Sequence, residues 1–127
     1  MKREIIATDR APAAVGPYSQ AVRVGDFVFT AGQLAIDPST GKLVEGGIEE
    51  QTRQVLRNIA AVLEAAGSSL DKVVKTTVFL RNMGDFKSMN KVYGEFFSDQ
   101  PPARSTVEVG DLALGALLEI EAIAVVG

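Results

Sequence analysis

The chain has 127 residues, of which 46% are hydrophobic and 23% are charged, and its 13 basic and 16 acidic side chains give a formal net charge of −3. This composition is typical of one soluble globular domain over residues 1–127, and it excludes extensive intrinsic disorder. The acidic balance disfavours surfaces that bind nucleic acids or anionic membranes, so neither is an expected partner.

The N-terminal third of the chain predicts three short strands. These are residues 2–6, residues 18–24, where apolar and polar side chains alternate roughly, and residues 27–31, and Gly25-Asp26 lies in a tight turn between the last two. Residues 37–42 contain proline, glycine and hydroxyl side chains, which are typical of a turn. The apolar runs are too short for a signal peptide or a membrane span, so we expect a cytoplasmic protein.

The middle of the chain alternates helices and strands. The apolar residues of 48–66 recur with a helical period, which predicts an amphipathic helix. Residues 72–80 are rich in β-branched side chains and predict a strand, and residues 84–97 predict a second helix with a largely aromatic buried stripe. The Pro101-Pro102 pair then breaks the helix, because proline lacks the backbone N–H.

Two further strands, over residues 103–109 and 117–126, complete the order β-β-β-α-β-α-β-β. This order predicts an α+β sandwich in which both helices pack on one face of a mixed β-sheet. Two helices cover only one side, so the opposite face needs a partner, and a second copy of the chain is the simplest one. The sequence therefore favours a homo-oligomer.

Arg104 lies in the first of the two C-terminal strands, and Glu119 and Glu121 are carboxylates in an otherwise apolar last strand. A buried carboxylate is costly without a partner, and a guanidinium expected on the neighbouring strand is the obvious candidate. Arg104 and Glu119 form either a structural cross-strand ion pair or the floor of a site for a small anion. On the second interpretation Arg104 holds a carboxylate, while Glu119 positions or deprotonates a water molecule.

Three further residues are candidates, each with a structural alternative. Tyr18 follows a Gly-Pro pair and is either an amphipathic edge-strand residue or a hydroxyl that lines a pocket. Gly32 marks a bulge or strand end, or it lets a ligand approach the backbone closely. Asn90 projects from the aromatic stripe of the second predicted helix, where an amide bonded to nearby backbone is the simpler interpretation. Any catalysis must rely on such groups, because the chain has neither histidine nor cysteine.

Six segments carry motifs that are more specific than any single residue. They are residues 11–20 (APAAVGPYSQ), 31–33 (AGQ), 54–67, 73–80 (VVKTTVFL), 102–109 (PARSTVEV) and 119–124 (EIEAIA). Together they resemble the Rid, or YjgF-type, family of reactive-intermediate deaminases over essentially the whole chain. The similarity is closest to the RidA subfamily of 2-iminobutanoate/2-iminopropanoate deaminases.

This resemblance implies a chorismate-mutase-like α+β fold assembled as a homotrimer, with clefts between neighbouring subunits. It also implies hydrolysis of enamine and imine intermediates such as 2-aminoacrylate and 2-iminopropanoate, which releases ammonia and a 2-keto acid without a cofactor or a metal. Arg104 then holds the substrate carboxylate, and Glu119 positions the attacking water. The remaining cleft residues that the resemblance implies are Tyr18, Gly32, Asn90 and Thr106.

The chain departs from the family pattern at two positions. Thr106 stands where many RidA members carry cysteine, which excludes thiol chemistry but keeps any backbone contact with the substrate. Ala31 stands where many members carry serine, so one substrate contact is expected to be weaker.

Two other functions compete with deamination. The same arginine would serve a non-catalytic, regulatory trimer that binds 2-keto acids or other small carboxylates. Relatives in this family have also been linked to ribonuclease and translation-inhibitor activity, which the acidic composition and the absence of histidine disfavour here.

Overall fold

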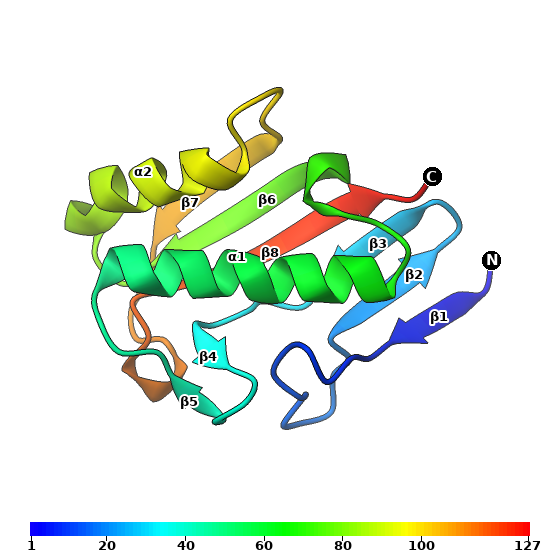
Figure 1. The fold of residues 1–127 in the computed structure, drawn as a ribbon, viewed down its shortest axis with the longest axis horizontal. Coiled ribbons are helices and arrows are strands. Elements are labelled where there is room, and N and C mark those ends of the chain that lie inside the picture. Colours follow the sequence, from blue (N-terminus) through cyan, green and yellow to red (C-terminus); the bar gives the residue numbers. More distant parts are fainter.

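The alternation of apolar and polar side chains produces a six-stranded sheet in the computed structural model, which describes residues 1–127. Its strands are β1 (Arg3–Ile6), β2 (Ala21–Val24), β3 (Phe27–Thr30), β6 (Val73–Leu80), β7 (Ala103–Glu108) and β8 (Leu118–Val125). They lie side by side in the order β1-β2-β3-β8-β6-β7 (Figure 1). Only β6 and β7 run parallel, so the sheet is mixed, as predicted.

Two helices, α1 (Ile48–Ala65) and α2 (Phe86–Phe96), lie on the same face of this sheet (Figure 1). The apolar stripe of α1 is fully buried and forms one hydrophobic core with the inward side chains of the strands, for example Leu56 with Ile120. The predicted α+β sandwich with both helices on one side is therefore confirmed. No helix has the length and apolar character needed to cross a membrane.

An additional two-stranded ribbon forms around the turn predicted at residues 37–42. Its strands are β4 (Ile36–Asp37) and β5 (Lys42–Leu43). The turn closes because the Gly41 N–H donates to the Asp37 carbonyl at 2.8 Å, while the Asp37 carboxylate accepts hydrogen bonds from Ser39. These hydrogen bonds from Ser39 lower the pKa of the Asp37 carboxyl.

The second strand begins at Ala21 rather than at residue 18, because the side chain of Gln20 is hydrogen-bonded to the preceding loop. Its buried side chain donates from Nε2 to the Pro12 carbonyl at 2.7 Å and accepts the Thr8 N–H at 2.7 Å. Residues 8–12 are thereby fixed against the end of the strand. A buried amide with all of its bonds made is a structural feature, and it shortens the predicted strand.

The sheet face that turns away from the helices has no cover within the chain. Phe27 and Phe29 of β3 point to this face and remain 47% and 45% exposed. An extended exposed apolar surface of this kind is typical of a protein–protein interface. We call it the open face, and its apolar residues are Ile5, Val22, Val24, Phe27, Phe29, Phe79, Val107, Ile123 and Val125.

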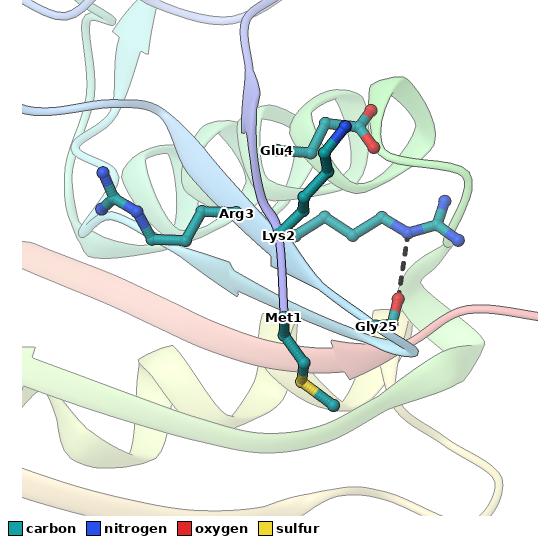
Figure 2. Close-up of a pocket in the computed structure, with 6 residues that line it drawn as sticks. Met1, Lys2, Arg3, Glu4 and Gly25 are labelled. Atoms are coloured by element: carbon teal, nitrogen blue, oxygen red, sulfur yellow. Dashed lines mark hydrogen bonds between the residues drawn. The ribbon is translucent and has the colours of Figure 1, made fainter.

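A hollow of about 810 Å³ lies beside the edge strand β1. Figure 2 shows that Met1 and Arg3 point away from Glu4 rather than toward a shared centre. The one hydrogen bond drawn there runs from Arg23 Nε to the Gly25 carbonyl at 3.2 Å. No predicted site residue lines this hollow, and β1 lies at the sheet edge opposite β7, so we place the candidate site elsewhere.

Candidate functional site

The cross-strand ion pair, one of the two interpretations of Arg104 and Glu119, does not form. Arg104 pairs with Thr76 of β6 on one side, and Glu119 pairs with Phe79 of β6 on the other, so β6 lies between the two charged strands. The registers also place the two side chains on opposite faces of the sheet. The cause is the crossover through α2, which carries β7 to the outer side of β6 and leaves the inner side for β8.

Arg104 points to the helix-covered side and lies against aromatic rings of α2. Its guanidinium carbon is 4.7 Å from the ring centre of Tyr93 and 5.5 Å from that of Phe86. The Arg104 guanidinium makes no hydrogen bond and no ion pair within the chain, whereas the backbone of Arg104 is part of the β6–β7 ladder. Its planar fork of N–H donors is therefore free to bind a carboxylate.

Two buried polar atoms near Arg104 also lack partners. Asn90 Oδ1 and Thr106 Oγ1 are shielded from solvent and have no hydrogen bond. Asn90 is one helical turn from Phe86 and close to one turn from Tyr93, and Thr106 shares a strand face with Arg104. The expected bond between the Asn90 amide and nearby backbone is thus wrong. Buried groups without partners are uncommon, and here they border the free guanidinium.

We call Phe86, Asn90, Tyr93, Arg104 and Thr106 the arginine half-site. A hollow of about 390 Å³ opens beside it, between the C-terminal turns of α2 and the start of β7. Its lining residues are Asn90, Tyr93, Gly94, Phe97, Pro101, Pro102 and Arg104. The hollow can admit a small anion with an apolar portion, because aromatic and proline side chains surround the single positive charge.

Glu119 projects from the open face and lies directly over the backbone of Gly32. A Cβ atom built on Gly32 would stand 2.1 Å from Glu119 Oε2, so no other residue fits there without moving the glutamate. The Glu119 side chain makes no hydrogen bond or ion pair within the chain. We call Tyr18, Gly32 and Glu119 the glutamate half-site.

The Gly32 region is a β-bulge, as one of the two sequence interpretations predicted. One residue more separates Phe29 from Gln33 than separates their pairing partners on β8. The bulge interrupts the ladder, and Thr30 Oγ1 accepts the N–H of Ala122 at 3.0 Å in place of a backbone carbonyl. Sequence and hydrogen bonding together thus place the Gly32 backbone under the glutamate.

The pKa of the Glu119 carboxyl is raised above the ordinary range of a glutamate. Partial burial is the larger cause, and the negative charge of Glu121, two residues along on the same face, adds to it. Because no cation offsets these effects, the carboxyl keeps its proton to a higher pH than an exposed glutamate does.

Tyr18 is half-exposed in the loop that leads into β2. Its hydroxyl oxygen accepts the Val15 N–H at 3.4 Å, and it makes no hydrogen bond to another candidate residue. The Ala31 N–H donates to the Gln20 carbonyl at 2.8 Å, so this loop adjoins the bulge. Tyr18 therefore lies at the same end of the β2–β3 hairpin as Gly32.

The sequence reasoning placed Tyr93 in the buried stripe of the second helix and missed its contact with Arg104. The available signal was the spacing of Phe86, Asn90 and Tyr93, which puts a polar side chain between two aromatic ones on one helix face. No group of three or more carboxylate side chains is placed to hold a metal ion.

Comparison with known proteins identifies related sequences over the full chain. A model of the family described as endoribonuclease L-PSP matches residues 8–126. A RutC family protein of Pyrococcus horikoshii is 57% identical over 122 residues, which cover 96% of this chain and 97% of the relative. The 2-iminobutanoate/2-iminopropanoate deaminase of Mus musculus is 48% identical over 125 residues, covering 98% and 93%.

Solved structures with the same fold are also related in sequence. RidA from an Antarctic Psychrobacter superimposes with a TM-score of 0.93 at 48% identity and covers 97% of this chain and 99% of its own. Escherichia coli TdcF with bound serine gives a TM-score of 0.93 at 43% identity, covering 98% and 99%. The fold and the motifs of the chain therefore point to the same group of proteins.

Proposed function

This chain belongs to the endoribonuclease L-PSP family, which includes the Rid deaminases, and from this premise we propose that it hydrolyses reactive enamine and imine intermediates. The substrates are of the 2-aminoacrylate and 2-iminopropanoate type, and the products are ammonia and a 2-keto acid. The observation that carries the proposal is the half-buried guanidinium of Arg104, which has no partner in the chain and lies beside two orphaned polar atoms.

The reaction needs orientation more than strong activation, because an imine carbon is already electrophilic. An enamine first takes a proton from solvent at its terminal carbon and loses one from nitrogen, which gives the imine. Arg104 holds the substrate carboxylate through two N–H donors. Glu119 accepts a proton from a water molecule whose oxygen attacks the imine carbon, and it returns that proton to nitrogen. A proton then passes from the carbinol hydroxyl to nitrogen as the C–N bond breaks, so that ammonia leaves and the carbinol oxygen becomes the keto oxygen.

One chain cannot bring both residues to the same substrate, because Arg104 and Glu119 lie on opposite faces of its sheet. We therefore infer a homotrimer with a cleft between each pair of neighbours. One copy supplies the arginine half-site and the next copy supplies the glutamate half-site. The exposed phenylalanines of the open face support such an assembly, since their burial favours association.

The direct test is the release of ammonia and 2-keto acid from freshly generated 2-aminoacrylate. Wild type is compared with Arg104→Ala at the same oligomeric state, measured by light scattering. We expect wild type to accelerate both releases and the variant to lose this acceleration. If wild type gives no acceleration over buffer, the deaminase assignment fails for this substrate.

A second test separates a shared cleft from a site within one chain. Arg104→Ala and Glu119→Gln are each expected to be inactive. When the two are unfolded together and refolded as mixed oligomers, some clefts combine the intact Arg104 of one copy with the intact Glu119 of another. Random mixing in a cyclic trimer restores about one quarter of the wild-type activity. No recovery, with mixed oligomers verified by mass, contradicts the shared cleft.

A carboxylate-binding regulator is the second candidate, favoured by the solved E. coli TdcF structure, which contains bound serine. Both functions use Arg104, so Glu119 discriminates between them. A deaminase loses turnover in Glu119→Gln but still folds and binds 2-oxobutanoate. A regulator has no turnover to lose, and its affinity for 2-oxobutanoate stays the same or increases when the negative charge is removed.

The family description also names an endoribonuclease, but the net charge of −3 disfavours RNA binding by this chain. RNA binding through phosphate contacts would weaken steeply with salt. We expect no retention of single-stranded RNA at low ionic strength, and a gel-shift titration that found it would reopen this assignment.

A further inference from the structure

Tyr93 is a buried aromatic residue to which the mechanism above gives no role. Only 5% of it is exposed, and its hydroxyl lies 2.7 Å from the hydroxyl of Thr76, which is fully buried on β6. Thr76 is also the backbone pairing partner of Arg104. Tyr93 thus links α2 to β6 at the residue of β6 that pairs with Arg104 of β7.

The contact between Tyr93 and Arg104 is a stacking contact and not a hydrogen bond. The guanidinium carbon lies 4.7 Å from the tyrosine ring centre, which is within the range of a cation–π interaction. Phe86 supplies a second ring at 5.5 Å. Phe97 packs against the other parts of Tyr93, with ring centres 4.7 Å apart, so the tyrosine ring is itself held in place.

This way of holding an arginine differs chemically from a salt bridge. A carboxylate partner would occupy two N–H donors and offset the positive charge. Fewer donors and less charge would then remain to bind a ligand. An aromatic face restrains the guanidinium plane while all of its N–H groups stay free. Burial raises the pKa of the Tyr93 hydroxyl, so the ring stays neutral beside the cation and does not become a competing anion.

We propose that Tyr93, anchored by Thr76, is a positioning residue that sets the guanidinium plane of Arg104 for two-point binding of the substrate carboxylate. The inference rests on the proposed function, because it assigns the carboxylate to Arg104. It goes further in predicting that loss of the Tyr93 ring weakens carboxylate binding because the guanidinium plane of Arg104 is no longer restrained. Tyr93 acts through Arg104 and not on the reacting atoms.

Two substitutions separate the ring from the hydroxyl. Tyr93→Leu removes the aromatic face, whereas Tyr93→Phe keeps the face and loses only the bond to Thr76. Met89→Ala is the matched control, because Met89 is fully buried on the same helix and makes no stacking contact with Arg104. For each protein, KM and kcat are measured with a 2-imino acid, and the Kd for 2-oxobutanoate is measured by calorimetry at one oligomeric state.

We expect Tyr93→Leu to raise both KM and the Kd for 2-oxobutanoate about tenfold, with a much smaller change in kcat. Tyr93→Phe, which keeps the ring, should show only a small part of this increase. Met89→Ala should leave KM and Kd near the wild-type values despite its lower stability. A purely structural role predicts instead that Tyr93→Leu and Met89→Ala behave alike, and that result overturns the inference.

The outcomes also separate this inference from the proposed function. If wild type turns over the imine and Tyr93→Leu keeps the wild-type KM and Kd, only the positioning role is wrong. If wild type shows no turnover, the proposed deaminase is wrong, and the binding data alone then decide. A weaker Kd in Tyr93→Leu supports the positioning role at a carboxylate-binding site, and a lack of 2-oxobutanoate binding by wild type removes it. If Tyr93→Leu does not fold, the aromatic variants Tyr93→Phe and Tyr93→Trp replace it in the test. A Kd and a KM near the wild-type values in both variants support the ring contact, and a tenfold loss in both contradicts it.

Discussion

Arg104, Glu119, Asn90 and Thr106 share one property: each has polar atoms without a hydrogen-bond partner in the chain. Leaving a buried polar atom unpaired costs about 1–3 kcal/mol, so such groups are not kept for stability. Their positions in two clusters on opposite sheet faces indicate that partners come from outside the chain. A substrate and a neighbouring copy are the partners that we propose.

The raised pKa of Glu119 predicts the acid side of the pH–rate profile. If the ionised carboxylate accepts a proton from water, activity falls as the pH drops through this raised pKa, at a higher pH than an exposed glutamate would give. Glu121→Gln removes the neighbouring negative charge, so the acid limb should move to lower pH. An acid limb that does not shift in Glu121→Gln would contradict this assignment of the limb to Glu119.

The same pKa has a consequence for stability. The folded state disfavours the ionised Glu119, so this carboxylate lowers the free energy of unfolding at pH values above its raised pKa. Glu119→Gln should therefore be more stable than wild type near neutral pH. The difference should vanish as the pH falls through the raised pKa toward that of an exposed glutamate. Thermal unfolding at several pH values checks both the sign and the window.

Gly32 provides a second test at this scale. In Gly32→Ala the new methyl group occupies the position of the Glu119 carboxylate, which must rotate away. We expect a loss of activity as large as that of Glu119→Gln, with the fold retained, because the clash is with a side chain and not with backbone. Gly110→Ala is the control, since a Cβ there meets nothing within 4 Å. Steady-state kinetics and circular dichroism of the two variants are the measurements.

Single residues were predictable from sequence where their chemistry conflicted with their surroundings. Glu119 stood out as a charge in an apolar strand, Arg104 as its candidate partner, and Gly32 as the mark of a bulge or a strand end. Tyr93 did not stand out, because an aromatic residue on the apolar face of a helix usually belongs to the hydrophobic core. Its role depends on a residue of a different strand, which no local pattern records.

At the scale of elements, the β3–β8 pairing depends on a side chain that replaces a backbone acceptor. Thr30→Val removes the hydroxyl that accepts the Ala122 N–H and leaves this part-buried group unpaired. We expect a loss of about 1–3 kcal/mol in the free energy of unfolding. Thr30→Ser keeps the hydroxyl and should lose much less. Urea denaturation of both variants checks the prediction, and equal losses would assign the effect to packing.

The types and approximate limits of the strands and helices followed from periodicity, but the order of strands in the sheet did not. The expectation that Arg104 and Glu119 lie on neighbouring strands assumed that strands consecutive in sequence also pair. The helix between β6 and β7 instead makes a parallel crossover, and β8 returns to the other side of β6. Apolar alternation identifies the buried face of each strand and contains no information on its neighbour.

At the scale of the whole molecule, the open face predicts that association and activity are lost together. Phe29→Glu places a charge at the centre of this face, and we expect smaller particles that retain the secondary structure but have no deaminase activity. Arg57→Glu introduces the same side chain on the exposed side of α1 and should change neither property. Light scattering and activity are measured on the same samples. A Phe29→Glu protein of wild-type mass and activity would exclude the open face as the interface.

The placement of the two half-sites on opposite faces also governs how a defective copy affects its neighbours. In the trimer that we propose, each copy lines two clefts, one through Arg104 and the other through Glu119. A chain that has lost one of these residues inactivates one cleft, whereas a chain that has lost both inactivates the two clefts that it lines. In a cell that makes both wild-type and doubly substituted chains, the defective chain would therefore be partly dominant, and its effect would depend on the ratio in which the two are made.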